Sequence, residues 1–184
     1  MTATQPVRIA LLTADHAPVY KTLRVEALRA APEAFTSDHA TAALRPASDY
    51  AARLAGQPGD GTFFLGAFDA AGQLVGSIGC ERAERLQERH IATVVAMMVA
   101  PGSQRGGIGR QLVQACVDQA AQVAGLEQLV LTVTAVNTHA VRLYERAGFR
   151  AYGLLPRATV VAGVGYDKLH MVRPLPSSPL FANA

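Results

Sequence analysis

A glycine-rich segment at residues 99–110 constrains the fold and function of this chain most strongly. An apolar run ends at Val99, three glycines then lie within four positions, and a helical pattern begins at Ile108. Glycine permits positive φ angles and a close approach of the backbone to a ligand. The free N–H groups at the start of a helix favour an anion. The segment therefore predicts a strand, a phosphate- or pyrophosphate-binding loop and a helix.

Three patterns for such a loop can be compared. The Walker A string G-x-x-x-x-G-K-[ST] does not occur. The dinucleotide pattern G-x-G-x-x-G fails twice, since Leu112 and Lys168 stand where the third glycine is needed. The pattern that fits is Q-x-x-G-x-G, formed by Gln104, Gly107 and Gly109. It resembles the acetyl-CoA loop of the GCN5-related N-acetyltransferases, the GNAT superfamily.

A second motif supports this resemblance. The apolar run 129–136 is followed by residues 137–149, which are similar to the family segment N-x-x-A-x-x-L-Y-x-x-x-G-F at every specified position. Residues 166–175 resemble the last strand of the family, and residues 26–35 resemble its first helix and the loop after it. The resemblance covers about residues 7–175.

The resemblance implies an α/β chain with the GNAT fold: a mixed, mostly antiparallel sheet of six to seven strands, a central parallel β-loop-α-β unit and flanking helices. With 184 residues we expect one domain, structured over 7–175, with a flexible tail at 176–184. Apolar patterns and turn residues predict the remaining elements. Strands are expected at 7–12, 62–68, 74–80, 91–99, 129–136, 149–155 and 166–172, helices at 15–31, 47–55, 108–123 and 137–147, and a loop at 33–46.

Composition limits the class of protein. The net charge is +3 and the isoelectric point about 9.1, which suits an anionic cofactor, but the basic residues form no stripe typical of nucleic-acid binding. No apolar run approaches the length of a membrane span, and the N-terminus lacks a signal-peptide pattern. We therefore expect no nucleic acid, no membrane and a cytoplasmic location. The two cysteines and the histidines show no ligand-like spacing, so no metal is expected.

The resemblance implies acetyl-CoA as co-substrate and a set of binding residues. The pantetheine arm is expected along the strand backbone at Met97, Met98 and Val99, whose side chains we interpret as core. The loop is expected to offer backbone N–H groups to the pyrophosphate, with Gln104 part of the same contacts. Its members are Arg105, Gly106, Gly107, Ile108, Gly109 and Arg110. Asn137 is predicted to cap the helix after it and to touch the cofactor.

Tyr144 is the predicted general acid. In this family the tyrosine of the second motif donates a proton to the departing thiolate, and a phenol with a pKa of about 10 stays protonated at neutral pH. The alternative is a tyrosine that only packs against the core. No cysteine or serine lies in a nucleophile setting, so we expect direct attack through a tetrahedral oxyanion, held by a backbone N–H at a bulge near Val99.

The general base and the acceptor are less defined. Thr132 stands where many members that acetylate protein N-termini carry a glutamate, so Glu81, Glu84, Glu88, His90 or a water chain are the alternatives. In the loop at 32–35, Phe35 is expected to wall the acceptor site and Glu33 to attract an amine cation, although a loop anchored by a buried phenylalanine fits equally. Small amines, amino acids, amine drugs and protein amino groups all remain open.

Two functions follow for comparison. The first is an N-acetyltransferase that moves an acetyl group from acetyl-CoA to a primary amine. The alternative is a non-catalytic acyl-CoA-binding or sensing domain that has kept the fold, which the intact Tyr144 argues against and Thr132 mildly favours. Homodimers are common in this family, so a homodimer is a candidate assembly, although nothing in the sequence shows an interface.

Overall fold

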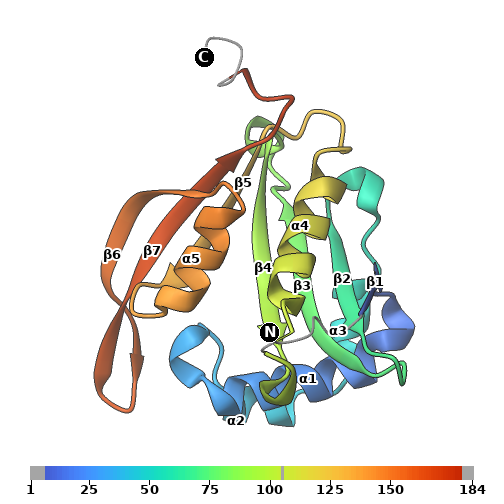
Figure 1. The fold of residues 1–184 in the computed structure, drawn as a ribbon, viewed down its shortest axis with the longest axis vertical. Coiled ribbons are helices and arrows are strands. Elements are labelled where there is room, and N and C mark those ends of the chain that lie inside the picture. Colours follow the sequence, from blue (N-terminus) through green and yellow to red (C-terminus); the bar gives the residue numbers. More distant parts are fainter. Residues whose placement is uncertain (1–6, 105, 180–184) are drawn as a thin grey trace.

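A seven-stranded sheet organises the chain, which the computed structural model describes over residues 7–104 and 106–179. The sheet order is β1-β2-β3-β4-β5-β7-β6, and neighbouring strands are antiparallel except β4 and β5, which are parallel (Figure 1). The strands are β1 Arg8–Leu11, β2 Phe63–Phe68, β3 Leu74–Arg82, β4 Ile91–Val99, β5 Gln128–Thr134, β6 Arg150–Val161 and β7 Val164–Pro174. The helices are α1 Ala17–Ala30, α2 His39–Leu44, α3 Ser48–Leu54, α4 Ile108–Ala120 and α5 Thr138–Arg146. The predicted mixed, mostly antiparallel sheet with a central parallel pair is confirmed.

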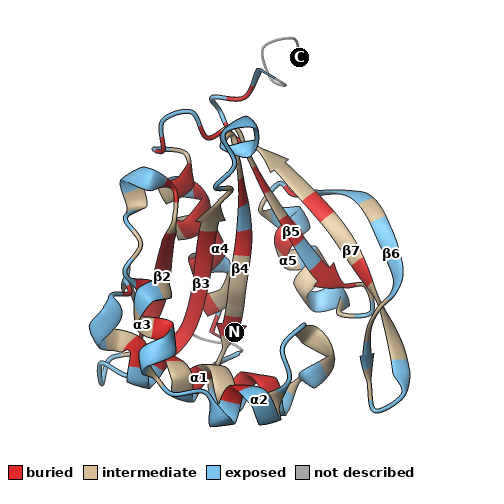
Figure 2. Cartoon of the chain, turned by 180° about the vertical axis from the view of Figure 1, so that it is seen from behind, coloured by how far each residue is buried: buried red, intermediate tan, exposed pale blue. Residues whose placement is uncertain are grey.

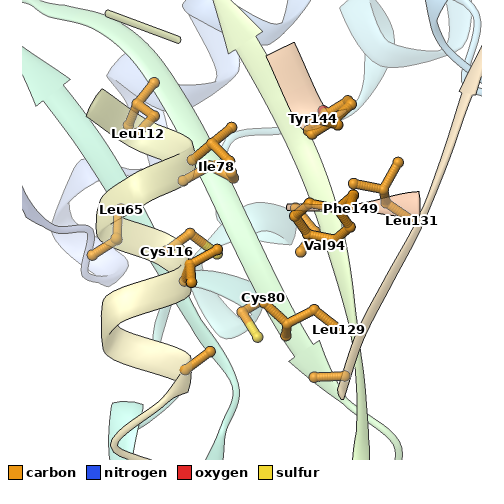
Figure 3. Close-up of a cluster of buried hydrophobic side chains, with 14 of the residues drawn as sticks. Leu65, Ile78, Cys80, Val94, Leu112, Cys116, Leu129, Leu131, Tyr144 and Phe149 are labelled. Carbon is orange, nitrogen blue, oxygen red and sulfur yellow. The ribbon is translucent and has the colours of Figure 1, made fainter. Parts of the chain in front are cut away.

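Helices cover both faces of this sheet. α4 and α5 lie on one face, and α1 and α3 lie on the other (Figures 1 and 2). The apolar residues of α4 recur at helical spacing, from Ile108 through Leu112 to Cys116, so one stripe of the helix is buried against β2 and β3. Figure 3 shows part of this first core, in which Leu112 and Cys116 lie with Leu65 and Ile78. A second core joins α1 and α3 to the opposite face.

Two segments differ from the sequence predictions. Residues 33–46, expected to be a loop, contain α2, which begins after Asp38, whose Oδ1 accepts a hydrogen bond from the Thr41 N–H at 2.8 Å. A helix of six residues spans fewer than two turns, so it leaves no apolar period for the sequence to show. The β6–β7 hairpin is longer than predicted, because its turn lies at Ala162 and Gly163, both of which have positive φ.

The C-terminal segment packs against the rest of the domain. Leu175 is fully buried, and the Ser177 hydroxyl donates to the Leu126 carbonyl oxygen at 2.6 Å. Tertiary packing thus continues into the segment predicted as a tail, and residues 180–184 lie outside the described part of the chain. In the described residues no helix has the length and apolar character needed to cross a bilayer.

Candidate active site

The site lies where β4 and β5 diverge. Their parallel pairing runs from Ile91 opposite Gln128 to Thr93 opposite Val130 and does not continue along the remainder of these two described strands. Figure 2 shows the strands adjacent at one end and apart at the end toward α1. Beyond Thr93, β4 therefore has backbone N–H and C=O groups on this side without a neighbouring strand. A groove of about 1830 Å³ lies along this opening and is lined from both faces of the sheet.

A bulge in β4 shapes the middle of the groove. The register with β3 shifts between Ser77 and Gly79, and Ala96 has a φ of 51°, which costs a non-glycine residue about 1–2 kcal/mol. The buried Ser77 hydroxyl donates to the Ala96 carbonyl oxygen at 3.0 Å and holds this conformation. Val95 and Ala96 consequently both face the second core, which breaks the strand alternation. The bulge had been expected near Val99; it lies at Ala96 instead.

The predicted strand residues line the groove as expected from their pattern. Met97, Met98 and Val99 all contribute to its wall. Met98 is buried in the second core, while Met97 and Val99 pack against the first. Their side chains are therefore core residues on alternating faces, which agrees with the interpretation from the sequence.

The glycine-rich loop leads into the N-terminus of α4 beside the groove. Gly107 is the N-cap residue with a φ of 70°, and no described side chain caps the helix there. The first N–H groups of α4 are therefore left for solvent or a ligand. Gly109 also lines the groove, and a Cβ there would lie 3.2 Å from Met97 Cε and 3.3 Å from Leu143 Cδ2. Gly107 thus permits a positive φ, and Gly109 permits the close approach of α4 to Met97 and Leu143.

The other described residues of the glycine-rich loop are either exposed in the groove or buried beneath it. Gln104 and Arg110 are exposed and line the groove. Gly106 and Ile108 are buried and support the turn rather than forming the groove wall. Arg105 lies outside the described residues.

Gln111 is a groove residue that the sequence analysis missed. Its Nε2 is buried and has no hydrogen-bond partner among the residues that the structure describes, and the residue lines the groove in the first turn of α4. A buried donor without a partner costs about 1–3 kcal/mol, so an acceptor atom from a ligand would stabilise this position. The Q-x-x-G-x-G pattern does not extend to Gln111, so the motif gave no signal for it.

Tyr144 both packs in the first core and lines the groove. It is 7% exposed, and its ring meets the Phe149 ring edge to face with centroids 5.8 Å apart (Figure 3). Burial raises the pKa of the Tyr144 phenol well above its usual value, and the nearby Cys116 thiol adds to the rise. The phenol is therefore un-ionised across the physiological pH range. Tyr144 therefore packs in the core and also lines the groove, so the two interpretations of this residue do not exclude each other.

Asn137 sets the start of the helix that carries Tyr144. Its side-chain oxygen accepts a hydrogen bond from the Ala140 N–H at 3.1 Å, which makes it the N-cap of α5. The residue also lines the groove. The predicted N-cap is confirmed, and its contact with a cofactor stays a prediction.

The loop at 32–35 closes the groove on the α1 side. Phe35 lines the groove and packs against the second core. Glu33 is half-buried and does not contribute to the described groove wall; its backbone carbonyl accepts a hydrogen bond from the Thr134 hydroxyl at 2.7 Å. Phe35 thus lies where a wall was expected, while the Glu33 carboxylate has no place in the groove lining.

Carboxylates are scarce in the groove. Among the described residues that line it, Asp118 on α4 is the carboxylate-bearing one, and its side chain accepts from Gln114 Nε2 at 2.7 Å. Thr132 lines the groove at the position discussed for a base. The proposed alternatives Glu81, Glu84, Glu88 and His90 lie outside the lining. Glu81 instead forms an ion pair with Arg53, with Oε1 2.7 Å from Nε.

Basic side chains occupy the α1 side of the groove, and the sequence analysis had not singled them out. Lys168 on β7 is buried, and its ammonium donates to the Thr134 hydroxyl at 2.8 Å and to the Ala34 carbonyl oxygen at 3.3 Å. Burial lowers the pKa of the Lys168 ammonium. Arg24 on α1 donates from Nη2 to the Ser37 hydroxyl at 2.8 Å. The partners of Lys168 lie 34 and 134 residues away in sequence and that of Arg24 lies 13 residues away, which explains why no local pattern revealed these contacts.

Comparison with known proteins decides the family. The model of the acetyltransferase (GNAT) family matches residues 24–149, which include both the glycine-rich loop and the segment with Tyr144. The chain belongs to the GNAT family. The fold and the resemblance inferred from the two motifs are thereby confirmed.

Individual relatives agree with this assignment. A curated mycothiol acetyltransferase from Salinispora tropica is 36% identical over 113 residues, which cover 61% of this chain and 37% of that protein. The chain thus spans well under half of the length of this curated relative.

Solved structures show the same fold. A phosphinothricin acetyltransferase from Sinorhizobium meliloti, in complex with acetyl-CoA, has a TM-score of 0.82 at 17% identity and covers 95% of this chain and 91% of that one. A GCN5-related N-acetyltransferase from Kribbella flavida has a TM-score of 0.78 at 25% identity, and the match covers 92% of this chain and 98% of that one.

Proposed function

We propose that this GNAT-family protein transfers the acetyl group of acetyl-CoA to a primary amine by direct attack through a tetrahedral intermediate. The observation that carries the proposal is the groove between the diverging β4 and β5, which combines the N-terminus of α4 and Tyr144. Family membership and the acetyltransferase names of the curated relatives support it.

The residues present fit acetyl-CoA in three respects. The uncapped N–H groups of α4 after Gly107 suit a pyrophosphate, because the helix dipole and free donors favour an anion. The unpartnered Gln111 Nε2 offers one more donor to an oxygen atom of the ligand. The unpaired edge of β4 beyond Thr93 can bond the amides of a pantetheine arm as a neighbouring strand would. The thioester supplies the activated acetyl group.

The residues of the chain then have distinct roles in the proposed reaction. The amine would approach from the α1 side, where Phe35 and Thr132 line the groove. Backbone N–H groups of β4 near the bulge at Ala96 would face the developing oxyanion. Tyr144 would donate its proton to the departing sulfur, since burial keeps the phenol neutral. With no carboxylate beside Thr132 in the described lining, a water chain or an already neutral amine would take the place of a base.

Location and assembly remain proposals of the same kind. A cytoplasmic site of action fits the two buried cysteines, which are free thiols without a disulfide framework. The homodimer is proposed from the family resemblance and is tested by measuring the mass of the protein in solution.

Two measurements test the proposed function. The first is the gain in thermal stability on adding acetyl-CoA, which reports binding. The second is release of the free CoA thiol in the presence of small amines, amino acids, polyamines and peptides. Binding with release supports an acetyltransferase, whereas binding without release from any acceptor supports the acyl-CoA-sensing alternative.

A further inference from the structure

We propose that the acceptor is a small amine that also carries a carboxylate, and that Arg24 and Lys168 bind this carboxylate on the α1 side of the groove. This inference rests on the proposed function and names the substrate class of the same site.

The charges on that side of the groove are of one sign. Arg24 on α1, Arg53 on α3 and Lys168 on β7 all line it. The carboxylate-bearing residue of the described lining, Asp118, belongs to α4, which covers the opposite face of the sheet. An acceptor entering beside α1 therefore meets positive charge.

Two of these three cations lack a counter-ion within the described chain. Arg53 is paired with Glu81 and lies over the Phe64 ring, 5.0 Å from its centroid. The described contacts of the Arg24 guanidinium and of the Lys168 ammonium are instead to neutral oxygens. Lys168 is buried, so its ammonium carries a desolvation cost that an anionic ligand would offset. Both groups also keep N–H donors that their described contacts do not use.

A buried hydroxyl lies beside the same cluster. Tyr20, one helical turn before Arg24, is fully buried, and its hydroxyl makes no hydrogen bond of standard geometry within the described part of the chain. Burial raises the pKa of the Tyr20 phenol, and the guanidinium groups of Arg24 and Arg53 oppose this rise. Arg24 and Arg53 thus both lie close to the Tyr20 hydroxyl, which concentrates positive charge on this side of the groove.

The shape of this side favours a small acceptor. The lining contributed by α1 and the segment after it consists of short side chains and one aromatic ring, Phe35. The short side chains are those of Ala27, Ala30, Ala31 and Ala34. They leave room for a compact molecule, while Phe35 and Val95 provide apolar contact for its side chain.

The positive charges of Arg24 and Lys168 would also reduce the need for a general base at the position of Thr132. Positive neighbours disfavour the protonated form of an amine, so they favour the neutral nucleophile. The carboxylate of the acceptor would be attracted while its ammonium would be driven to lose a proton to solvent. Arg24 and Lys168 act in this scheme as positioning residues that do not exchange protons with the substrate.

Matched acceptors test the inference. We would measure CoA-thiol release with an amino acid, its amide and its decarboxylated amine, which share one side chain; phenylalanine, phenylalaninamide and phenethylamine form such a set. The amino acid should react with a kcat/KM about 10- to 100-fold higher, the effect of losing hydrogen bonds to a charged group. Arg24→Gln and Lys168→Gln should each remove most of this preference by raising KM for the amino acid, with little change for phenethylamine. Lys168→Arg should restore part of it.

Controls separate the outcomes. Arg29→Gln changes an exposed arginine of α1 outside the groove lining and should leave all three rates unchanged. Stabilisation by acetyl-CoA should be the same in every variant, which shows that each one is folded and binds the co-substrate. Equal rates for the three acceptors, or variants that lose activity on all three equally, overturn the inference and leave the proposed function standing. Absence of CoA release with every acceptor overturns both.

Discussion

Replacing Tyr144 by phenylalanine removes the proposed proton donor with the least disturbance of the core. The ring would keep its edge-to-face contact with Phe149 and its burial in the first core. The substitution removes one oxygen atom, whose burial raises the pKa of the phenol well above its usual value. A loss of activity would therefore report the missing proton rather than a displaced helix.

The substitution should have a large effect on the reaction rate and a small effect on the free energy of unfolding. Loss of a positioned general acid lowers the rate by about 100- to 10,000-fold, or about 3–5 kcal/mol of transition-state stabilisation. The free energy of unfolding should change by less than about 1 kcal/mol, because no described hydrogen bond involves the hydroxyl and the ring packing is kept. We expect the whole effect in kcat, with acetyl-CoA binding unchanged.

The assay is the steady-state release of CoA thiol at saturating acetyl-CoA, with thermal unfolding measured in parallel. Tyr152→Phe is the matched control, since Tyr152 is 61% exposed on β6 and lies outside the groove lining. A Tyr144→Phe variant that turns over as fast as the unmodified protein would refute the assignment of the proton donor, and the tyrosine would then be a core residue alone.

Four further outcomes follow from the contacts described. Gly107→Ala should lower the free energy of unfolding by about 1–2 kcal/mol, because its φ of 70° disfavours a side chain; chemical denaturation measures this. Gln111→Leu should weaken acetyl-CoA binding about 10-fold in calorimetry without destabilising the free protein, since its Nε2 has no partner within residues 7–104 and 106–179 to lose. Asn137→Ala should cost about 1 kcal/mol of stability by removing the α5 cap, and an unchanged midpoint would contradict that role. The pKa of Lys168 is lower in the folded protein than in the unfolded chain, so the unfolded chain keeps this proton to a higher pH. The free energy of unfolding should therefore rise as the pH approaches 10.5 from below, and its dependence on pH, measured by chemical denaturation, should be weaker in Lys168→Gln.

The sequence predicted the parts of the site that are local in the chain. The loop before α4 and the segment after β5 each hold their glycines, asparagine and tyrosine within about a dozen residues, so their spacing carries the signal. The parallel β4–β5 pair was predicted from the same two motifs, whereas the order of the strands in the sheet was not predicted. Gly107 and Asn137 each lie at the N-cap of a helix, where the sequence patterns predict that a helix begins. Capping involves only the adjacent backbone, so the local sequence is enough to predict it.

The remaining features depend on tertiary contacts. The bulge at Ala96 is held by the Ser77 hydroxyl from the neighbouring strand, so the apolar run of β4 gave no sign of it. Lys168 reached the groove through contacts with Thr134 and Ala34, which are far from it in sequence. The Glu33 carboxylate was expected at the acceptor site by its place in the loop, yet the groove lining on that side is basic.

Release of the CoA thiol from acetyl-CoA, measured with a carboxylate-bearing amine and its decarboxylated counterpart, tests the account most directly. We expect release that depends on enzyme and acceptor and is faster for the amine that carries the carboxylate. A folded protein that acetyl-CoA stabilises against heat, yet which releases no thiol with any amine, would contradict it.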